Sequence, residues 1–255
     1  MIDLHCHILP GLDDGPLAME ESVEMAEAAI VDGVTHLVAT PHSNSRYFFD
    51  YPKIRALCKE LQDRIGERLK LATGCDFHLN PENIYALREH APQFCINQKE
   101  YLLVEFNEIA IPPGIEKTFH EMQLAGLRPI ITHPERNRLL RRRPEQLSKW
   151  MQQGCFGQVT GGAIVGRFGS LAQDTAMEWI GAGLIHFVSS DAHNMNSRPP
   201  ELRRAYDVLE KEFGPDKARA LFVENPLAAF EGRELPHVPE LEKEAPVRKK
   251  KFFLF

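Results

Sequence analysis

Short apolar segments alternate with longer amphipathic segments along most of this chain, and this alternation constrains the fold more than any other feature. We expect seven strands, at residues 2–8, 34–40, 69–75, 101–106, 128–132, 156–160 and 185–190. Buried strands that alternate with helices usually pair in parallel, through right-handed crossovers. The sequence therefore predicts an α/β protein. Seven such strands favour a (β/α) barrel, and an open doubly wound sheet is the alternative.

Helices are predicted between most of these strands. The clearest covers residues 19–33, where Val23 and Ile30 lie on one face, acidic residues occupy the first turn and Gly33 follows the last turn. The other predicted helices cover residues 52–66, 114–125, 144–153, 169–182 and 199–212. The connection after the third strand contains NPENIYALREH, and we expect a brief helix there at most.

The composition limits the domain organisation and the partners. The 255 residues are 43% hydrophobic, which is enough for one large core, and the net charge of −6 gives no reason to expect a nucleic-acid partner. We expect one domain over residues 1–231 and a charged, proline-containing tail over residues 232–255. The tail ends in RKKKFFLF, for which contact with an anionic membrane surface and a disordered, solubilising role are both open.

The cysteine pattern indicates a reducing compartment. The five cysteines are odd in number and form no C-x-x-C pair, unlike the cysteines of a secreted disulfide scaffold. The N-terminal residues lack a basic region followed by an apolar run, and no apolar stretch reaches the length of a membrane helix. We therefore expect a cytoplasmic protein.

Histidines and carboxylates lie at the ends of the predicted strands. In parallel α/β proteins the C-terminal strand ends form one face, which carries the chemistry, so these residues are expected to meet. Only the sixth strand ends without such a residue. The set contains His5, His7, His42, Asp76, Glu105, His133, Asp191 and His193.

Imidazole and carboxylate groups together suit zinc, manganese or iron. Residues at positions i and i+2 of a strand point to the same side, so His5 and His7 can bind one ion while Cys6 points away. A lone histidine at a strand end is usually only a polar loop residue, and the prediction depends on the joint pattern. The ligands are too many for one tetrahedral ion, which indicates a cluster of two or three. The other six histidines are assigned surface or packing roles: His36, His78, His90, His120, His186 and His237.

Several segments carry a resemblance to a known family. They are DLHCHILPGLDDGP, ATPH, GCD, VEF, HPERN and SDAHNMNSR, in this order between residues 3 and 198. The chain resembles the polymerase and histidinol phosphatase (PHP) superfamily, and within it the bacterial protein-tyrosine phosphatases of capsule and exopolysaccharide loci. The resemblance implies a distorted (β/α)7 barrel similar to a TIM barrel, in agreement with the seven predicted strands.

The resemblance also implies a centre of three divalent metal ions, with manganese as the first choice and iron or zinc as alternatives. The implied ligand sets are His5, His7, Asp76 and Asp191; Asp76, Glu105 and His133; and Asp14, His42 and His193. Asp76 departs from the usual glutamate, and its shorter side chain puts a bridging role in doubt. Asp13 is expected to support the loop. Arg136 and Arg198 match phosphate-binding arginines, against the alternative of ordinary surface arginines.

The predicted function is hydrolysis of phosphotyrosine by a metal-activated hydroxide. The resemblance implies a tyrosine-phosphorylated protein as substrate, specifically a bacterial tyrosine kinase that controls capsule or exopolysaccharide synthesis. The alternatives are a small-molecule phosphomonoesterase of the histidinol-phosphate type and a non-catalytic regulatory module. Cys58 and Arg64 have the C-x5-R spacing of cysteine-dependent phosphatases. However, their segment is helical by pattern and acidic, and we interpret Cys58 as a packing residue.

Overall fold

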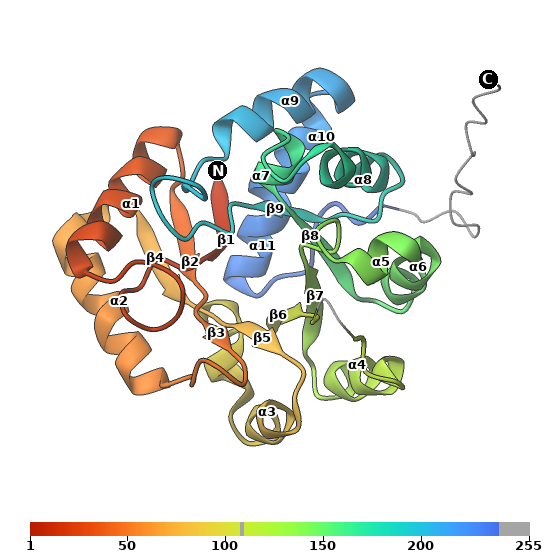
Figure 1. The fold of residues 1–255 in the computed structure, drawn as a ribbon, viewed down its shortest axis with the longest axis horizontal. Coiled ribbons are helices and arrows are strands. Elements are labelled where there is room, and N and C mark those ends of the chain that lie inside the picture. Colours follow the sequence, from red (N-terminus) through yellow and green to blue (C-terminus); the bar gives the residue numbers. More distant parts are fainter. Residues whose placement is uncertain (108–109, 240–255) are drawn as a thin grey trace.

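The computed structural model describes residues 1–107 and 110–239 and consists of parallel strands surrounded by helices (Figure 1). Every strand pair is parallel, with the order β1-β2-β4 in one sheet and β3-β5-β6-β7-β8-β9 in the other. The prediction of an α/β fold with parallel pairing is confirmed. The strands are β1 (Ile2–Cys6), β2 (His36–Ala39), β3 (His42–Ser43), β4 (Lys70–Thr73), β5 (Asp76–His78), β6 (Tyr101–Glu105), β7 (Arg128–Thr132), β8 (Phe156–Thr160) and β9 (Phe187–Ser189).

Two short strands, β3 and β5, follow directly after the predicted strands 34–40 and 69–75 and were not predicted. Pro41 lies between β2 and β3 and cannot donate a ladder hydrogen bond. Gly74 lies between β4 and β5, where a Cβ atom would approach Cγ1 of Val38 to 3.0 Å. Asp76 follows the predicted strand, as expected, and also begins β5.

Backbone hydrogen bonds connect the two sheets. The Gly74 amide donates to the Ala39 carbonyl at 2.9 Å and so extends the β2–β4 pairing of the first sheet towards β3 and β5 of the second. At the other edge, the Asp191 amide donates to the His5 carbonyl at 2.8 Å, and the His7 amide donates to Ala192 at 2.8 Å. The segment after β9 therefore lies directly beside β1, so the first and last strands of the chain are neighbours.

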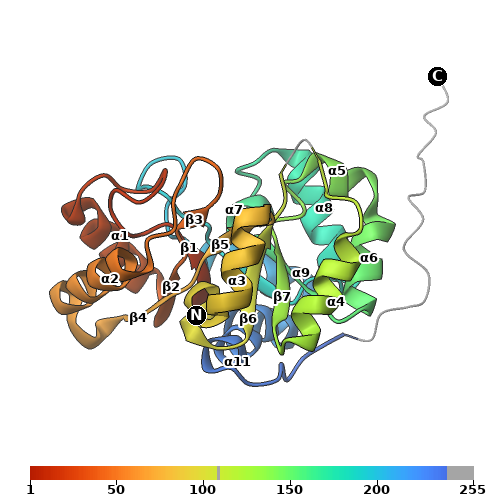
Figure 2. The ribbon, with the colours of Figure 1, turned by 90° about the horizontal axis from the view of Figure 1, so that it is seen from below.

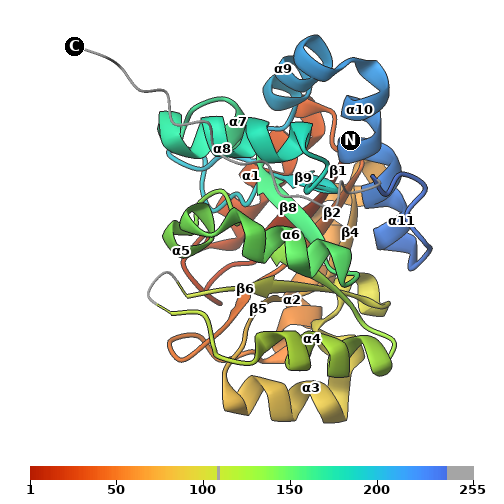
Figure 3. The same cartoon turned by 90° about the vertical axis from the view of Figure 1, so that its right-hand side faces the viewer.

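Helices form a layer around the strands, with α1 and α2 on one side and α4, α6 and α8 on the other (Figures 1 and 3). They are α1 (Met19–Asp32), α2 (Tyr51–Ile65), α3 (Pro81–Phe94), α4 (Ile115–Leu124), α5 (Arg138–Arg142), α6 (Pro144–Gln152), α7 (Gly161–Ile164), α8 (Ser170–Gly181), α9 (Arg203–Phe213), α10 (Pro215–Arg219) and α11 (Asn225–Glu231). Short 3-10 helices cover Gly66–Arg68 and Ile96–Gln98, and a π-helical turn covers Ala220–Glu224.

The helix after the third predicted strand is longer than expected. Asn80 caps α3, because its side-chain oxygen accepts the Asn83 amide at 2.7 Å and Pro81 occupies the first turn. The helix continues past His90, which has non-helical dihedral angles, to Phe94. The kink at His90 divides α3 into a first helix within the predicted segment NPENIYALREH and a short helical turn up to Phe94, which contains Pro92 and was not predicted.

Other differences concern the last third of the chain. The helix expected over residues 199–212 begins at Arg203, where Asp32 of α1 accepts the backbone amides of Leu202 at 2.5 Å and Arg203 at 2.8 Å. Helices were not predicted at α5, at α7 or anywhere in residues 215–231.

The elements of residues 215–231 cover the N-terminal ends of the strands. Figure 2 shows α11 near the N-terminus of the chain, opposite the loops that follow β1 and β9. Phe230 is buried with Tyr101 and Phe187 in a cluster at this end. Tyr101 also donates a hydrogen bond from its hydroxyl to the Arg233 carbonyl at 2.8 Å. The opposite strand ends are thus left for a functional site.

The helices and the C-terminal segment are the features of the chain that concern membrane contact. No helix of residues 1–107 and 110–239 is both long enough and apolar enough to span a bilayer. Residues 232–239 form no helix or strand. The basic-aromatic segment RKKKFFLF lies outside the described residues, and its contact with a membrane stays a prediction.

Candidate metal centre and phosphate site

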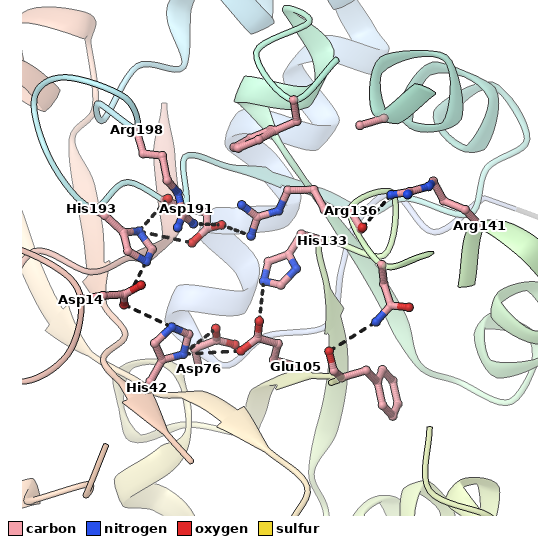
Figure 4. A pocket seen from close by; sticks show the side chains of 14 residues that line it. Asp14, His42, Asp76, Glu105, His133, Arg136, Arg141, Asp191, His193 and Arg198 are labelled. Carbon is pink, nitrogen blue, oxygen red and sulfur yellow. Dashed lines mark hydrogen bonds and ion pairs between the residues drawn. The ribbon is translucent and has the colours of Figure 1, made fainter. Parts of the chain in front are cut away.

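The side chains predicted as metal ligands come together at the C-terminal strand ends. They surround a cavity of about 530 Å³, which Figure 4 shows from close by. His5 and His7 are 0% and 1% exposed and lie against the same group of side chains. The predicted residues that line the cavity are Asp14, His42, Asp76, Glu105, His133, Arg136, Asp191, His193 and Arg198.

The possible ligand atoms form overlapping groups, each with all atoms within 4.8 Å of one another. The groups are His7, Asp14, His42 and His193; His5, His7 and Asp76; Asp76, Glu105 and His133; and His42, His78 and Glu105. The first three groups correspond to the three ligand sets that the family resemblance implied. The group with Asp14, His42 and His193 also includes His7, and the group with His5, His7 and Asp76 lacks Asp191. His78 is the difference from the sequence analysis. It was assigned a surface or packing role, but it forms an ion pair with Glu105.

The spacing of these atoms fits ligands of bound ions. Donor atoms at about 2.0–2.1 Å from one ion are separated from each other by about 3.0–3.4 Å. Nε2 of His5 lies 3.2 Å from Nε2 of His7 and 3.4 Å from Oδ2 of Asp76. Nε2 of His42 lies 3.4 Å from Oδ1 of Asp14, which is also 3.4 Å from Nε2 of His193.

Several of these atoms are buried without a hydrogen bond. Within the described part of the chain this holds for Nδ1 of His42, both carboxylate oxygens of Asp76, Oε2 of Glu105 and Nε2 of His193. Their close contacts are with other candidate ligands of the cluster, such as Asp76 Oδ2 with Nδ1 of His42 at 3.2 Å. A buried carboxylate that lacks hydrogen bonds is normally paired or bound to a metal. The nitrogen and oxygen donors suit manganese, iron or zinc. The residues present therefore fit a divalent metal cluster.

The charges within the cluster shift its pKa values strongly. Burial opposes the charge on His5, but the carboxylates of Asp76 and Asp191 raise its pKa to about 9. Burial also opposes the charge on His42, but Asp14 and Asp76 raise its pKa to about 11. The carboxylate of Asp76, which is common to both rings, thus favours positive charge between His5 and His42. Burial and the neighbouring His193 ring instead lower the pKa of His7 to about 4, so this ring is a neutral donor.

Two residues of the cluster have left-handed backbone conformations. The φ angle is 33° at His133 and 51° at Asp191. Non-glycine residues rarely adopt this region, and when they do the surrounding structure must hold them there. The Asp191 amide is held by the His5 carbonyl, and the His133 carbonyl accepts the Arg136 amide at 2.6 Å. These bends direct both side chains into the cluster.

Gln158 and Asp13 orient the first-strand histidines. Oε1 of Gln158 lies 3.0 Å from Nδ1 of His5, and Oδ2 of Asp13 lies 2.7 Å from Nδ1 of His7. Each ring therefore directs Nε2 towards the cluster. Asp13 also accepts the His42 amide at 3.0 Å, in agreement with its expected supporting role. Gln158 was not predicted as a site residue, although a glutamine within a predicted buried strand was a usable signal.

Arg136 and Arg198 reach the cluster through Asp191. Both donate a hydrogen bond to its Oδ2 (Figure 4). Its Oδ1 lies 3.5 Å from Nε2 of His5 and from Nε2 of His7. The Arg136 guanidinium also lies over the ring of Phe168, 4.8 Å from its centre. Both arginine side chains remain about one-fifth exposed and line the cavity, where they can receive an anion.

The cysteines lie outside this site. Cys6 is fully buried, with Sγ 3.8 Å from the Ala192 carbonyl, and burial raises its pKa well above the ordinary value. Cys58 lies within α2, where burial raises its pKa to about 11. Arg64 is paired with Glu60 at 2.8 Å. These thiols are thus poor nucleophiles, and the C-x5-R spacing lies within a helix instead of a phosphate-binding loop.

Comparison with known proteins identifies close relatives. The tyrosine-protein phosphatase YwqE of Bacillus subtilis is 35% identical over 262 residues, which cover 100% of both chains. The tyrosine-protein phosphatase CpsB of Streptococcus pneumoniae is 29% identical and covers 89% of this chain and 96% of its own length. A solved structure, described as YwqE and CpsB, unique metal-dependent tyrosine phosphatases, matches with a TM-score of 0.88. That match has 34% identity and covers 96% of this chain and 100% of the solved chain.

More distant structures share only the fold. A β-aspartyl dipeptidase from Fervidobacterium islandicum AW-1 matches with a TM-score of 0.60 at 18% identity, over 91% of this chain and 72% of its own. The family described as capsular polysaccharide synthesis, CpsB/CapC, matches residues 1–231. With this match and the identity to YwqE, the chain belongs to the CpsB/CapC family.

Proposed function

We propose that this protein is a metal-dependent protein-tyrosine phosphatase that hydrolyses phosphotyrosine in a protein substrate. The observation that carries the proposal is the position of Asp191, which contacts the histidine–carboxylate cluster with one oxygen and holds Arg136 and Arg198 with the other. This arrangement places two phosphate-binding groups beside a site that fits divalent ions. The names of the relatives, which are tyrosine-protein phosphatases, support the substrate class.

The proposed centre contains three divalent ions, with manganese as the first choice. Its proposed ligands are His5, His7, Asp14, His42, Asp76, Glu105, His133, Asp191 and His193. We further propose that residues 1–231 form one domain and that its strands form a distorted (β/α)7 barrel. The hydrogen bonds between the segment after β9 and β1 support this closure.

In the proposed mechanism, Arg136 and Arg198 bind the phosphoryl oxygens of the substrate. Their planar guanidinium groups match two oxygens at once, and Asp191 orients both of them before the substrate arrives. The histidines and carboxylates of the cluster would hold divalent ions, whose contribution would be to lower the pKa of water so that hydroxide forms near neutral pH. Gln158 and Asp13 fix the orientation of His5 and His7 through their Nδ1 atoms.

The walls of the cavity favour an aromatic phosphate ester over histidinol phosphate. Phe106, Phe168 and Ala172 line it beside the two arginines. An aromatic ring that leaves water for such a wall gains hydrophobic stabilisation, whereas a charged amino alcohol loses hydration. We therefore propose a phosphotyrosine side chain as the substrate, carried by a bacterial tyrosine kinase of a capsule or exopolysaccharide locus, in the cytoplasm. The five free, buried cysteines are consistent with a reducing compartment.

Phosphate release in the presence of Mn²⁺ tests the proposal. We expect turnover of a phosphotyrosine peptide and little turnover of histidinol phosphate. Preference for histidinol phosphate would favour the small-molecule alternative, and no turnover of either by protein shown to hold metal would favour a regulatory module.

Variants of the arginines test the phosphate contact separately. Arg136→Lys and Arg198→Lys keep the positive charge but lose the planar fork, and we expect a drop in kcat/KM on the order of 10- to 100-fold with unchanged metal content. Arg55→Lys, on the exposed face of α2, is the matched control and should behave as wild type. Wild-type kcat/KM in both site variants would refute the proposed phosphate contacts.

A further inference from the structure

The short helix α5, directly after the HPER segment, is strongly basic. Its sequence RLLRR carries Arg138, Arg141 and Arg142, and Arg143 follows it. Arg138, Arg142 and Arg143 are exposed, and Arg141 is half-buried. Since the chain as a whole has a net charge of −6, this is a local concentration of positive charge.

These arginines lack acidic partners. Elsewhere in the protein, arginines such as Arg64, Arg68 and Arg167 form ion pairs with nearby glutamates. Among residues 1–107 and 110–239, by contrast, no carboxylate pairs with Arg138, Arg141, Arg142 or Arg143 (the α5 arginines). The positive charge of the α5 arginines is thus not neutralised within this part of the chain.

Arg141 connects this helix to the cavity. Its NH1 group donates hydrogen bonds to the backbone carbonyl of Glu135 at 2.9 Å and to that of Arg136 at 2.6 Å, the second of which Figure 4 shows. No other nitrogen of its guanidinium has a hydrogen-bond partner within the described residues, and its side chain lines the same cavity as Arg136. Arg141 is therefore a fixed cation with free donors at the cavity wall.

The backbone also fixes α5 relative to the site. Asn137 caps the helix, because its Oδ1 accepts the amides of Leu139 at 2.9 Å and Leu140 at 3.2 Å. The same side chain donates from Nδ2 to the Phe106 carbonyl at 3.3 Å, at the end of β6. The helix thus has a defined position beside the cavity, with Arg141 at the cavity wall and Arg138 and Arg142 on the same short helix.

We propose that Arg141, together with Arg138 and Arg142, binds a second anionic group of the peptide substrate while Arg136 and Arg198 hold the phosphotyrosine. This inference rests on the proposed function and extends it to a substrate preference. The group is a carboxylate or a second phosphate on a residue near the phosphotyrosine, since an arginine fork accepts either. Arg141 contributes most, because its position is fixed and partly desolvated, whereas exposed ion pairs are weak.

Three phosphotyrosine peptides distinguish the sources of the anion. Their flanking residues are neutral, glutamate or a second phosphotyrosine, and kcat/KM is measured for each with the manganese-loaded full chain. We expect wild type to prefer at least one anionic peptide over the neutral one by about tenfold, the effect of one charge-assisted hydrogen bond. The preferred peptide identifies the anion.

Two sets of variants locate the preference. Arg141→Gln should reduce the ratio of kcat/KM between anionic and neutral peptides to near one. Arg138→Gln/Arg142→Gln, in which neither side chain forms a hydrogen bond or ion pair within the described residues, should reduce it about threefold, with a larger effect at low salt. Arg55→Gln on α2 removes the same charge at a distance and should leave the ratio unchanged.

The outcomes separate the inference from the proposed function. Equal kcat/KM for all three peptides in wild type, with turnover intact, would overturn the inference alone. An equal loss on all peptides in Arg141→Gln, with an unchanged ratio in the double variant, would indicate only a structural role for Arg141 and would also overturn it. No turnover of any peptide by wild type would refute the proposed function, and the inference with it.

Discussion

Asp191 holds Arg136 through Oδ2, while the other oxygen of the same carboxylate lies 3.5 Å from Nε2 of His5. One side chain therefore contacts both the proposed metal ligands and a proposed phosphate-binding group. The carboxylate is almost fully buried and Arg136 keeps its pKa well below the ordinary value, against the effect of burial. The Asp191 carboxylate is thus an anion that supports both the proposed metal site and the proposed phosphate-binding arginines.

Replacement of this anion should affect metal and phosphate binding together. Asp191→Asn preserves the size of the side chain but removes the charge, and leaves Arg136 and Arg198 without their anionic partner. We expect kcat/KM on a phosphotyrosine peptide to fall on the order of 100-fold or more, together with a lower metal content by elemental analysis. Asp207→Asn, at an exposed position of α9, is the control. Full metal content and wild-type activity in Asp191→Asn would contradict the assigned role.

The thiols should be dispensable. Cys6 and Cys58 are buried and their thiols have raised pKa values, so neither is an effective nucleophile. We predict that Cys6→Ser and Cys58→Ser retain most of the activity, whereas His5→Ala loses it. A folded Cys58→Ser variant with normal metal content but without activity would replace the metal mechanism by a cysteine mechanism.

Gln158 should control metal affinity without contacting substrate. Its Oε1 accepts from His5 and fixes the ring, so Gln158→Leu should weaken metal binding on the order of 10- to 100-fold, as other outer-shell substitutions do. Gln158→Glu keeps an acceptor for Nδ1 and should retain tight binding. Titration of metal-stripped protein with Mn²⁺ measures both. Unchanged affinity in Gln158→Leu would show that His5 needs no such support.

The clustering of the candidate ligands was predictable because parallel strands bring their C-terminal ends to one face, where a histidine or carboxylate follows nearly every predicted strand. The role of Gln158 was not predicted, since it depends on how one side chain meets His5 across the strands. The helical turn that follows the kink at His90 in α3 was not predicted, since it lies beyond the segment NPENIYALREH. The helices of residues 215–231 are short and their stability depends on packing against the strand ends, as at Phe230, which no local pattern encodes.

His186 should make the fold sensitive to acid at a point remote from the cluster. Its Nδ1 accepts the Gly157 amide at 3.2 Å, and burial, followed by the charge of Lys217, lowers its pKa to about 4 from an ordinary value of 6.5. The unfolded chain therefore binds the proton more tightly, and stability falls as the pH decreases from 6.5 towards 4.

His186→Gln cannot gain this proton and should lose less stability on acidification. Between about pH 7 and about pH 5 we expect the free energy of unfolding of wild type to fall by about 2 kcal/mol more than that of the variant. Urea unfolding at both pH values measures the difference, in which contributions common to the two proteins cancel. Parallel pH profiles would show that His186 does not titrate in this way.

The most direct test of the central claim is phosphate release from a phosphotyrosine peptide by metal-stripped protein as Mn²⁺ is added back, with bound metal measured in the same samples. We predict no turnover in the stripped protein and recovery in proportion to bound metal. We also predict that neither metal nor activity is restored in His5→Ala. Full turnover by protein free of metal would contradict the account.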